Sequence, residues 1–201
     1  MATTYMGLDE MDKAIEILKA HNAGGLYNDR IGQTLAICGR TEEAEPFLSR
    51  AMAKLVADLA NLIVGYINVY FKRGDHASAQ AILDLGIGFF LGMRDGDKPN
   101  YLDKVSSALI TALACSQFLS GQEDEARRTF KRARELAAFF DAAPSYDESD
   151  IRFVTRIEGA SAYDDIGSTA TDGMDRVVNE FENEDLTAFW NQVKEQENAN
   201  G

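Results

Sequence analysis

The sequence predicts an all-α fold made of antiparallel helix pairs joined by glycine turns. The first observation behind this prediction is a recurring pattern: a glycine, then a small, a large and a small residue on one helix face. The clearest copy, GQEDEARRTFKRARELAAFF, places Ala126, Phe130 and Ala133 after Gly121. The second observation is that only three prolines interrupt the 201 residues.

The pattern has three further copies along the chain. They comprise Gly39, Ala44, Leu48 and Ala51; Gly74, Ala79, Leu83 and Gly86; and a weaker set of Ala14, Leu18 and His21. With the apolar stripes between them, these copies predict helices at 9–21, 26–38, 42–54, 55–73, 76–90, 101–120 and 122–140. Gly39 is predicted to end the second helix and Thr41 to cap the third. Pro46 is expected to make the start of that third helix irregular.

The repeated alanines indicate a family. Those at positions 14, 44, 79 and 126 are separated by 30, 35 and 47 residues, and the middle interval is close to the roughly 34 residues of a tetratricopeptide repeat. Each Gly-x4-Ala-x3-(Leu/Phe)-x2-(Ala/Gly) unit resembles the second helix of such a repeat, and GRTEEAEPFLSRAMA resembles the kinesin-light-chain variety. The small residue of the first helix is Gly32 in one repeat and Ala114 in another, whereas Ile67 departs from the pattern. The resemblance covers residues 8–140 and implies a right-handed α-solenoid.

The chain changes character after residue 140. Residues 141–173 are predicted to be a turn-rich connector, with a short helix at 151–157 and linker composition from 159. Residues 174–201 carry two amphipathic stripes, one of Met174, Val177, Val178 and Phe181 and one of Leu186, Phe189, Trp190 and Val193. We expect these two helices to form an acidic cap on the repeat domain. The alternative is a detachable segment that occupies the groove or docks on another protein.

Charge is distributed unevenly and argues against nucleic acid as a ligand. The net charge is −13. Residues 1–140 hold 18 acidic and 16 basic side chains, whereas residues 141–201 hold 15 acidic and 4 basic ones. Such an acidic tail repels phosphate, so direct binding of DNA or RNA is not expected.

The sequence also predicts a cytoplasmic, soluble protein. Cys38 and Cys115 lie in apolar helical patterns without the spacing of a disulfide framework or zinc site, which favours a reducing compartment. The first residues lack the basic start and apolar core of a signal peptide. The most apolar run, at 55–71, contains Asp58, Asn61 and Asn68, so we expect no membrane span.

Nothing in the sequence indicates an enzyme, a metal site or a cofactor. His21 and His76 are interpreted as packing, cap or surface residues. No G-x-S-x-G, H-E-x-x-H or phosphate-binding glycine loop occurs. The acidic stretches at 95–97 and 145–150 lack the glycine and distal glutamate of an EF-hand loop, so they are interpreted as solvated loops.

The resemblance implies a binding surface on the concave face, lined by the first helices of successive repeats. Carried over position by position, that face comprises Asp29, Gln33, Asn61, Val64, Asn68, Lys72, Thr111, Cys115 and Phe118. Asn and Gln side chains suit an extended peptide because each can donate and accept hydrogen bonds. Family members that clamp a carboxylate use a cluster of Lys and Arg with Asn. Only Lys72 and the asparagines remain here, so capture of a C-terminal carboxylate is not expected.

The function predicted from these observations is non-catalytic recognition of a protein or peptide. The alternative is the sensory or dimerising module of a transcriptional regulator, because RELAAFFDAAPSYDESDIRF resembles the end of the repeat array in bacterial helix-turn-helix regulators. The chain shows no basic DNA-reading helix, so the alternative requires a DNA-binding domain that this chain does not contain. A homodimer through exposed repeat ends is also expected to be possible, because an uncapped apolar flank favours self-association.

Overall fold

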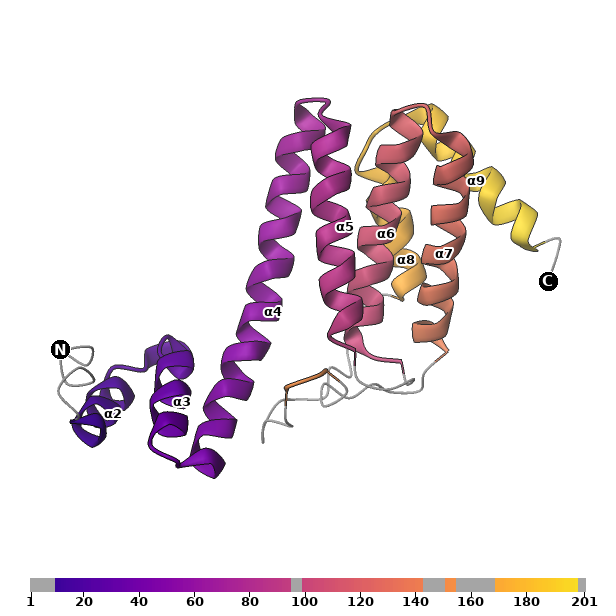
Figure 1. Ribbon diagram of the computed structural model, residues 1–201. Helices are drawn as coiled ribbons and strands as arrows, with labels where there is room; N and C mark the ends of the chain where they lie inside the picture. Colours follow the sequence, from indigo (N-terminus) through magenta and orange to yellow (C-terminus); the bar gives the residue numbers. More distant parts are fainter. Residues whose placement is uncertain (1–9, 95–98, 143–150, 155–168, 199–201) are drawn as a thin grey trace. The chain divides into compact units, whose positions relative to one another are not determined.

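A computed structural model describes residues 10–94, 99–142, 151–154 and 169–198. The part that it describes is all-helical, apart from one isolated β-bridge between Arg94 and Ile151, which confirms the all-α prediction. The helices are α2 (Met11–Ala20), η1 (Ala23–Gly25), α3 (Asn28–Ile37), α4 (Thr41–Lys72), α5 (His76–Gly92), α6 (Tyr101–Leu119), α7 (Glu123–Asp141), α8 (Ala170–Asn179) and α9 (Glu184–Asn198) (Figure 1).

The chain divides into two compact units, and the division falls within α4, after Asp58. The N-terminal unit contains α2, α3 and the first part of α4, together with residues 153 and 154. The bundle unit contains the second part of α4 and α5 to α9.

Three turns share one backbone geometry, as the recurring glycines predict. Gly39, Gly74 and Gly121 have φ angles of 76°, 67° and 77°, a left-handed conformation that glycine adopts without steric cost. In each turn the amide after the glycine donates to a carbonyl five residues earlier, as Gln122 does to Gln117 at 2.9 Å. The glycine amide donates three residues back. These bonds satisfy carbonyls left open at the helix end, so each glycine stops its helix.

A small apolar core holds the N-terminal unit together. It comprises Ile15, Leu18, Ile31, Leu35 and Ala44, with Tyr27 and Phe47 packed against it. α3 approaches α4 closely because Gly32 has no side chain: a Cβ there would lie 2.6 Å from Cγ of Leu48. The small residue expected at position 32 is therefore required by packing.

The bundle unit is built around α6, which packs against α5, α7, α8 and α9. Between Ser106 and Gln117 every residue except Ala108 is buried. A helix that is apolar or neutral on all sides is stable only when neighbours cover it completely. The repeat residues Ala126, Phe130 and Ala133 of α7 are fully buried, as predicted from their spacing.

Two local features reinforce the starts of α6 and α8. Asn100 and Asp103 form a capping box at the start of α6, and Thr169 and Asp172 form another at the start of α8. α8 therefore begins at Ala170, ahead of the predicted start at residue 174.

Three predicted boundaries differ from the structure. Helices expected at 42–54 and 55–73 form one continuous helix, α4, because no glycine or proline lies between Pro46 and Gly65 to interrupt it. Thr41 is the first residue of α4 and not its cap. Residues 151–154 are not helical, since Ile151 pairs with Arg94 and the amide of Arg152 donates to the carbonyl of Met93 at 2.7 Å. The stretches predicted as solvated loops at 95–97 and 145–150, and most of the predicted linker, lie outside the described residues.

Candidate functional site

One group of predicted binding residues forms a row on α4. Asn61, Val64, Asn68 and Lys72 are all exposed, and 51% of Val64 is accessible. Their spacing of three to four residues places them on one side of the helix. Asp29 and Gln33 are also exposed, but they lie on α3 in the N-terminal unit, where Asp29 is 3.7 Å from Arg30.

The predicted binding residues on α6 are buried or only partly accessible. Thr111 and Cys115 are fully buried, and the Thr111 hydroxyl donates to the carbonyl of Ser107 at 2.8 Å. Burial raises the pKa of the Cys115 thiol, which is therefore protonated and unreactive at neutral pH. The ring of Phe118 lies 4.7 Å from that of Phe189. The Phe189 ring of α9 thus contacts Phe118, and Thr111 is enclosed within the bundle.

An aromatic cluster attaches α9 to α7. The Phe130 ring lies 4.8 Å from Trp190 and 6.2 Å from Phe189, and the Arg127 guanidinium lies 4.7 Å from the Phe189 ring. Arg127 also donates a hydrogen bond to Gln196 at 2.9 Å. Stacked rings and a cation over a ring add to the apolar contact. This cluster joins α9 to α7 through side chains of both helices.

Two carboxylates fix the C-terminal helices further. Asp141, at the end of α7, accepts hydrogen bonds from the amides of Ala170 and Thr171 at 2.6 and 3.0 Å, so it caps α8. Asp175 accepts from the Trp190 indole at 2.6 Å and from Lys194 at 2.9 Å. Partial burial raises the pKa of Asp175, but these two hydrogen bonds together with the charges of Lys194 and Arg134 outweigh it, and the net effect lowers that pKa.

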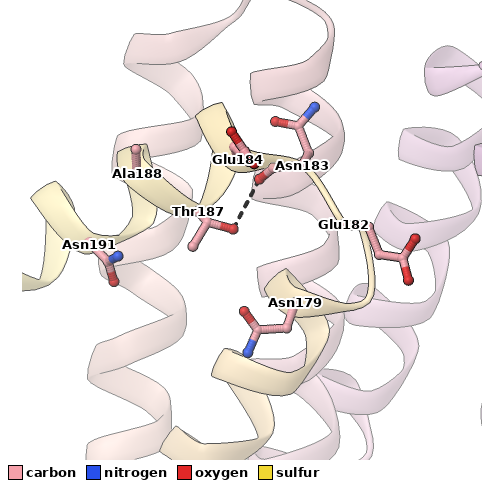
Figure 2. A pocket seen from close by; sticks show the side chains of 7 residues that line it. All are labelled: Asn179, Glu182, Asn183, Glu184, Thr187, Ala188 and Asn191. Atoms are coloured by element: carbon pink, nitrogen blue, oxygen red, sulfur yellow. Dashed lines mark hydrogen bonds between the residues drawn. The ribbon is translucent and has the colours of Figure 1, made fainter.

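A shallow concavity of about 530 Å³ lies at the turn between α8 and α9 (Figure 2). Its lining is polar and includes Asn179, Glu182, Asn183, Glu184 and Asn191. The Asn183 side chain is already used, because its oxygen accepts from the amide of Leu186 at 2.8 Å and so caps α9. The concavity offers hydrogen-bonding groups but no nucleophile paired with a base.

The other titratable groups of the described residues form no catalytic arrangement. His21 contacts the carbonyl of Ile17 at 2.8 Å on the surface, and His76 lies 6.1 Å from the Phe71 ring. Asp103 is buried, and its carboxylate lies 2.8 Å from the Arg94 guanidinium. Burial raises the pKa of this carboxyl, although the hydrogen bond from the Asn100 amide and the Arg94 charge oppose the effect. Among the residues described, no group of three His, Cys, Asp or Glu side chains could hold a metal ion.

The comparisons with known proteins identify no family. Neither a family model, nor a curated protein, nor a solved structure matches this chain.

A second exposed face of α4 was missed by the sequence reasoning. It carries Leu48, Leu55, Leu62 and Val69 at intervals of seven residues, with exposed fractions of 42%, 52%, 55% and 41%. Met52, Leu59 and Tyr66 lie between them, four residues after one and three before the next. This alternation of four and three residues is the heptad signal of a helix that packs against another helix, and the printed sequence contains it.

By length and composition alone, α4 is long and apolar enough to cross a membrane. Only 17% of its most apolar 18-residue segment is buried. The sequence reasoning had considered the run at 55–71 too interrupted for this. The difference arises because α4 is not broken near residue 54, so the apolar window belongs to a helix of 32 residues.

Proposed function

We propose that this chain is a non-catalytic, cytoplasmic scaffold that binds an extended protein segment along α4. The observation that carries the proposal is the exposed row of Asn61, Val64, Asn68 and Lys72 on one side of one helix. Extended peptides expose unpaired backbone amides and carbonyls, and an asparagine side chain can satisfy both.

The row offers complementary groups in a fixed order. Asn61 and Asn68 are seven residues apart, or about 10 Å along the helix, which matches the spacing of peptide groups three residues apart in an extended chain. Val64 lies between them and supplies an apolar contact. Lys72, at the C-terminal end, would attract an acidic side chain of the ligand.

The repeated turns support the solenoid part of the proposal. We propose that α4 with α5 and α6 with α7 are successive tetratricopeptide-like repeats, because each pair is joined by the same glycine turn. The direct contact of α5 with α6 is the contact that stacking of two such pairs requires. In this arrangement α8 and α9 act as the cap that covers α6.

The test is a selection of peptides from a random displayed library on the intact chain, followed by measurement of affinity by fluorescence anisotropy. The double variant Asn61→Ala, Asn68→Ala should bind selected peptides about tenfold or more weakly, since each lost hydrogen bond costs about 1 kcal/mol. The matched control, Asn179→Ala with Asn191→Ala, removes two asparagines from the α8–α9 concavity and should leave the affinity unchanged. The reverse result would move the binding site to that concavity.

A further inference from the structure

We propose that the heptad face of α4 binds the same face of a second copy of this chain, with the two helices antiparallel. The residues concerned are Leu55, Leu59, Leu62, Tyr66 and Val69, called here the α4 seam. They lie on a different side of α4 from Asn61 and Asn68, and Lys72 alone is shared with the peptide-binding row. This inference goes beyond the peptide-binding proposal and does not depend on it, because Asp58 and Gly65 belong only to the contact between copies.

The spacing of the seam indicates that its partner is a helix. Large apolar residues alternate at intervals of four and three, which keeps them on one line when two helices wrap around each other. Leu59 and Tyr66 occupy a positions, and Leu55, Leu62 and Val69 occupy d positions. Leu62, Tyr66 and Val69 are 41% to 55% exposed, so the contact would remove apolar surface from water.

The residues beside the seam indicate that the partner helix is α4 itself. The g positions are Asp58, Gly65 and Lys72. In an antiparallel pair each a residue faces a d residue, and g positions face g positions. When Leu59 faces Val69 and Leu62 faces Tyr66, Asp58 faces Lys72 of the second copy. The two-fold symmetry produces this charge pair twice.

The centre of the same arrangement has room for close approach. Gly65 faces Gly65 of the second copy at the symmetry axis, and a Cβ at Gly65 would meet no atom within 4 Å. Lys72 has no ion-pair partner among the described residues, whereas Asp58 contacts Lys54 on the surface at 2.5 Å. The antiparallel contact would therefore provide Lys72 with a carboxylate.

The same face is less suited to a lipid surface. Helices that lie on membranes carry mainly Lys and Arg on the polar side, and spanning helices rarely carry an unpaired acid. α4 has Asp58 beside the seam and two asparagines on its polar side, and the chain carries a net charge of −13. Anionic lipid would repel such a chain.

The first experiment measures the mass of the intact chain by sedimentation equilibrium across a range of concentrations. We expect a monomer–dimer equilibrium. Asp58→Lys and Lys72→Asp should each weaken the dimer about tenfold, because each places two like-charged pairs in the contact. The double variant Asp58→Lys, Lys72→Asp should restore the wild-type constant to within about threefold. Failure of the double variant to recover would overturn the antiparallel register.

A second experiment probes the symmetry axis directly. In a Cys38→Ser background, which leaves only the buried Cys115, Gly65→Cys should be joined to its copy by a short bismaleimide linker. The matched control, Ala57→Cys, is exposed on the opposite side of α4 and should not be joined. Equal cross-linking of the two variants would contradict the proposal.

The third variant, Leu62→Glu, separates a second copy from a membrane. Circular dichroism should show an unchanged fold, since Leu62 is 55% exposed, while the dimer is lost. The wild-type chain should not float with vesicles of neutral or anionic phospholipid. A wild-type chain that is monomeric at all concentrations and floats with vesicles in a Leu62-dependent manner would overturn the proposal in favour of a lipid surface.

Discussion

α4 and α6 are both long helices rich in apolar residues, yet their environments are opposite. α6 is buried almost completely between Ser106 and Gln117, whereas Leu55, Leu62 and Val64 of α4 are more than half exposed. The difference follows from their neighbours: α6 is covered by α5, α7, α8 and α9, while the buried side of α4 is limited to residues such as Ile63 and Ile67. Apolar composition therefore does not tell which helix is core and which is a surface for binding.

The largest effect should come from the aromatic cluster that covers α6 and α7. Phe130→Ala removes a fully buried ring that contacts Phe189 and Trp190, and it should lower the free energy of unfolding by about 3–5 kcal/mol. Leu62→Ala on α4, measured by urea unfolding of dilute protein, should change it by less than about 0.5 kcal/mol. Equal costs would mean that the exposed face of α4 is part of a core after all.

An intermediate effect on stability is expected from alanine substitutions in α5, at one glycine that faces α4 and at one that faces open space. A Cβ at Gly86 of α5 would lie 2.5 Å from Cδ1 of Ile63, so the end of the Ile63 side chain must shift, and Gly86→Ala should be less stable than Gly88→Ala by about 1 kcal/mol. Two residues further along the same helix, a Cβ at Gly88 would meet nothing within 4 Å. Gly88→Ala should therefore stabilise by about 0.5–1 kcal/mol. Thermal unfolding of the two variants gives the comparison, and a loss of stability in both would show that helix packing is not the cause.

The smallest effect concerns how pH acts on the C-terminal helices. The pKa of Asp175 is lower in the folded protein than in the unfolded chain, so its ionised form favours the folded state. This contribution is present above the unfolded pKa of about 3.9 and is lost as pH falls through the folded pKa. Asp175→Asn should thus lower the melting temperature at pH 6, and the gap to wild type should close towards pH 3. A gap that is constant with pH would contradict the role of the charge.

The sequence correctly predicted the ends of those helices that stop at a glycine turn. The turns at Gly74 and Gly121 were correct because a glycine with positive φ stops a helix whatever surrounds it. The break expected near residue 54 was wrong because it came from the repeat pattern, with no glycine or proline at that point. In both cases the presence or absence of a glycine or proline determined whether the helix ended at the predicted position.

The exposure of the candidate site residues was predictable only where no segment distant in the sequence packs over them. The exposure of Asn61 and Asn68 agrees with a helix face that is polar in the sequence. Phe118 contacts Phe189, which follows it by about seventy residues, and no local pattern around Phe118 reveals that contact. The α4 seam could have been found, because its heptad spacing is complete in the sequence from Leu48 to Val69.

The bonds from Asp141 to the start of α8 have a consequence for insertion tolerance. Because Ala170 and Thr171 are bonded to Asp141, the stretch between them closes a ring whose ends are fixed. The same stretch is tied to the bundle once more where Ile151 pairs with Arg94. The entropy of closing such a ring grows only with the logarithm of its length, at about 0.6 kcal/mol for each doubling. A change in the length of the chain that joins Asp141 to Ala170 should therefore alter the stability of α8 and α9 only slightly.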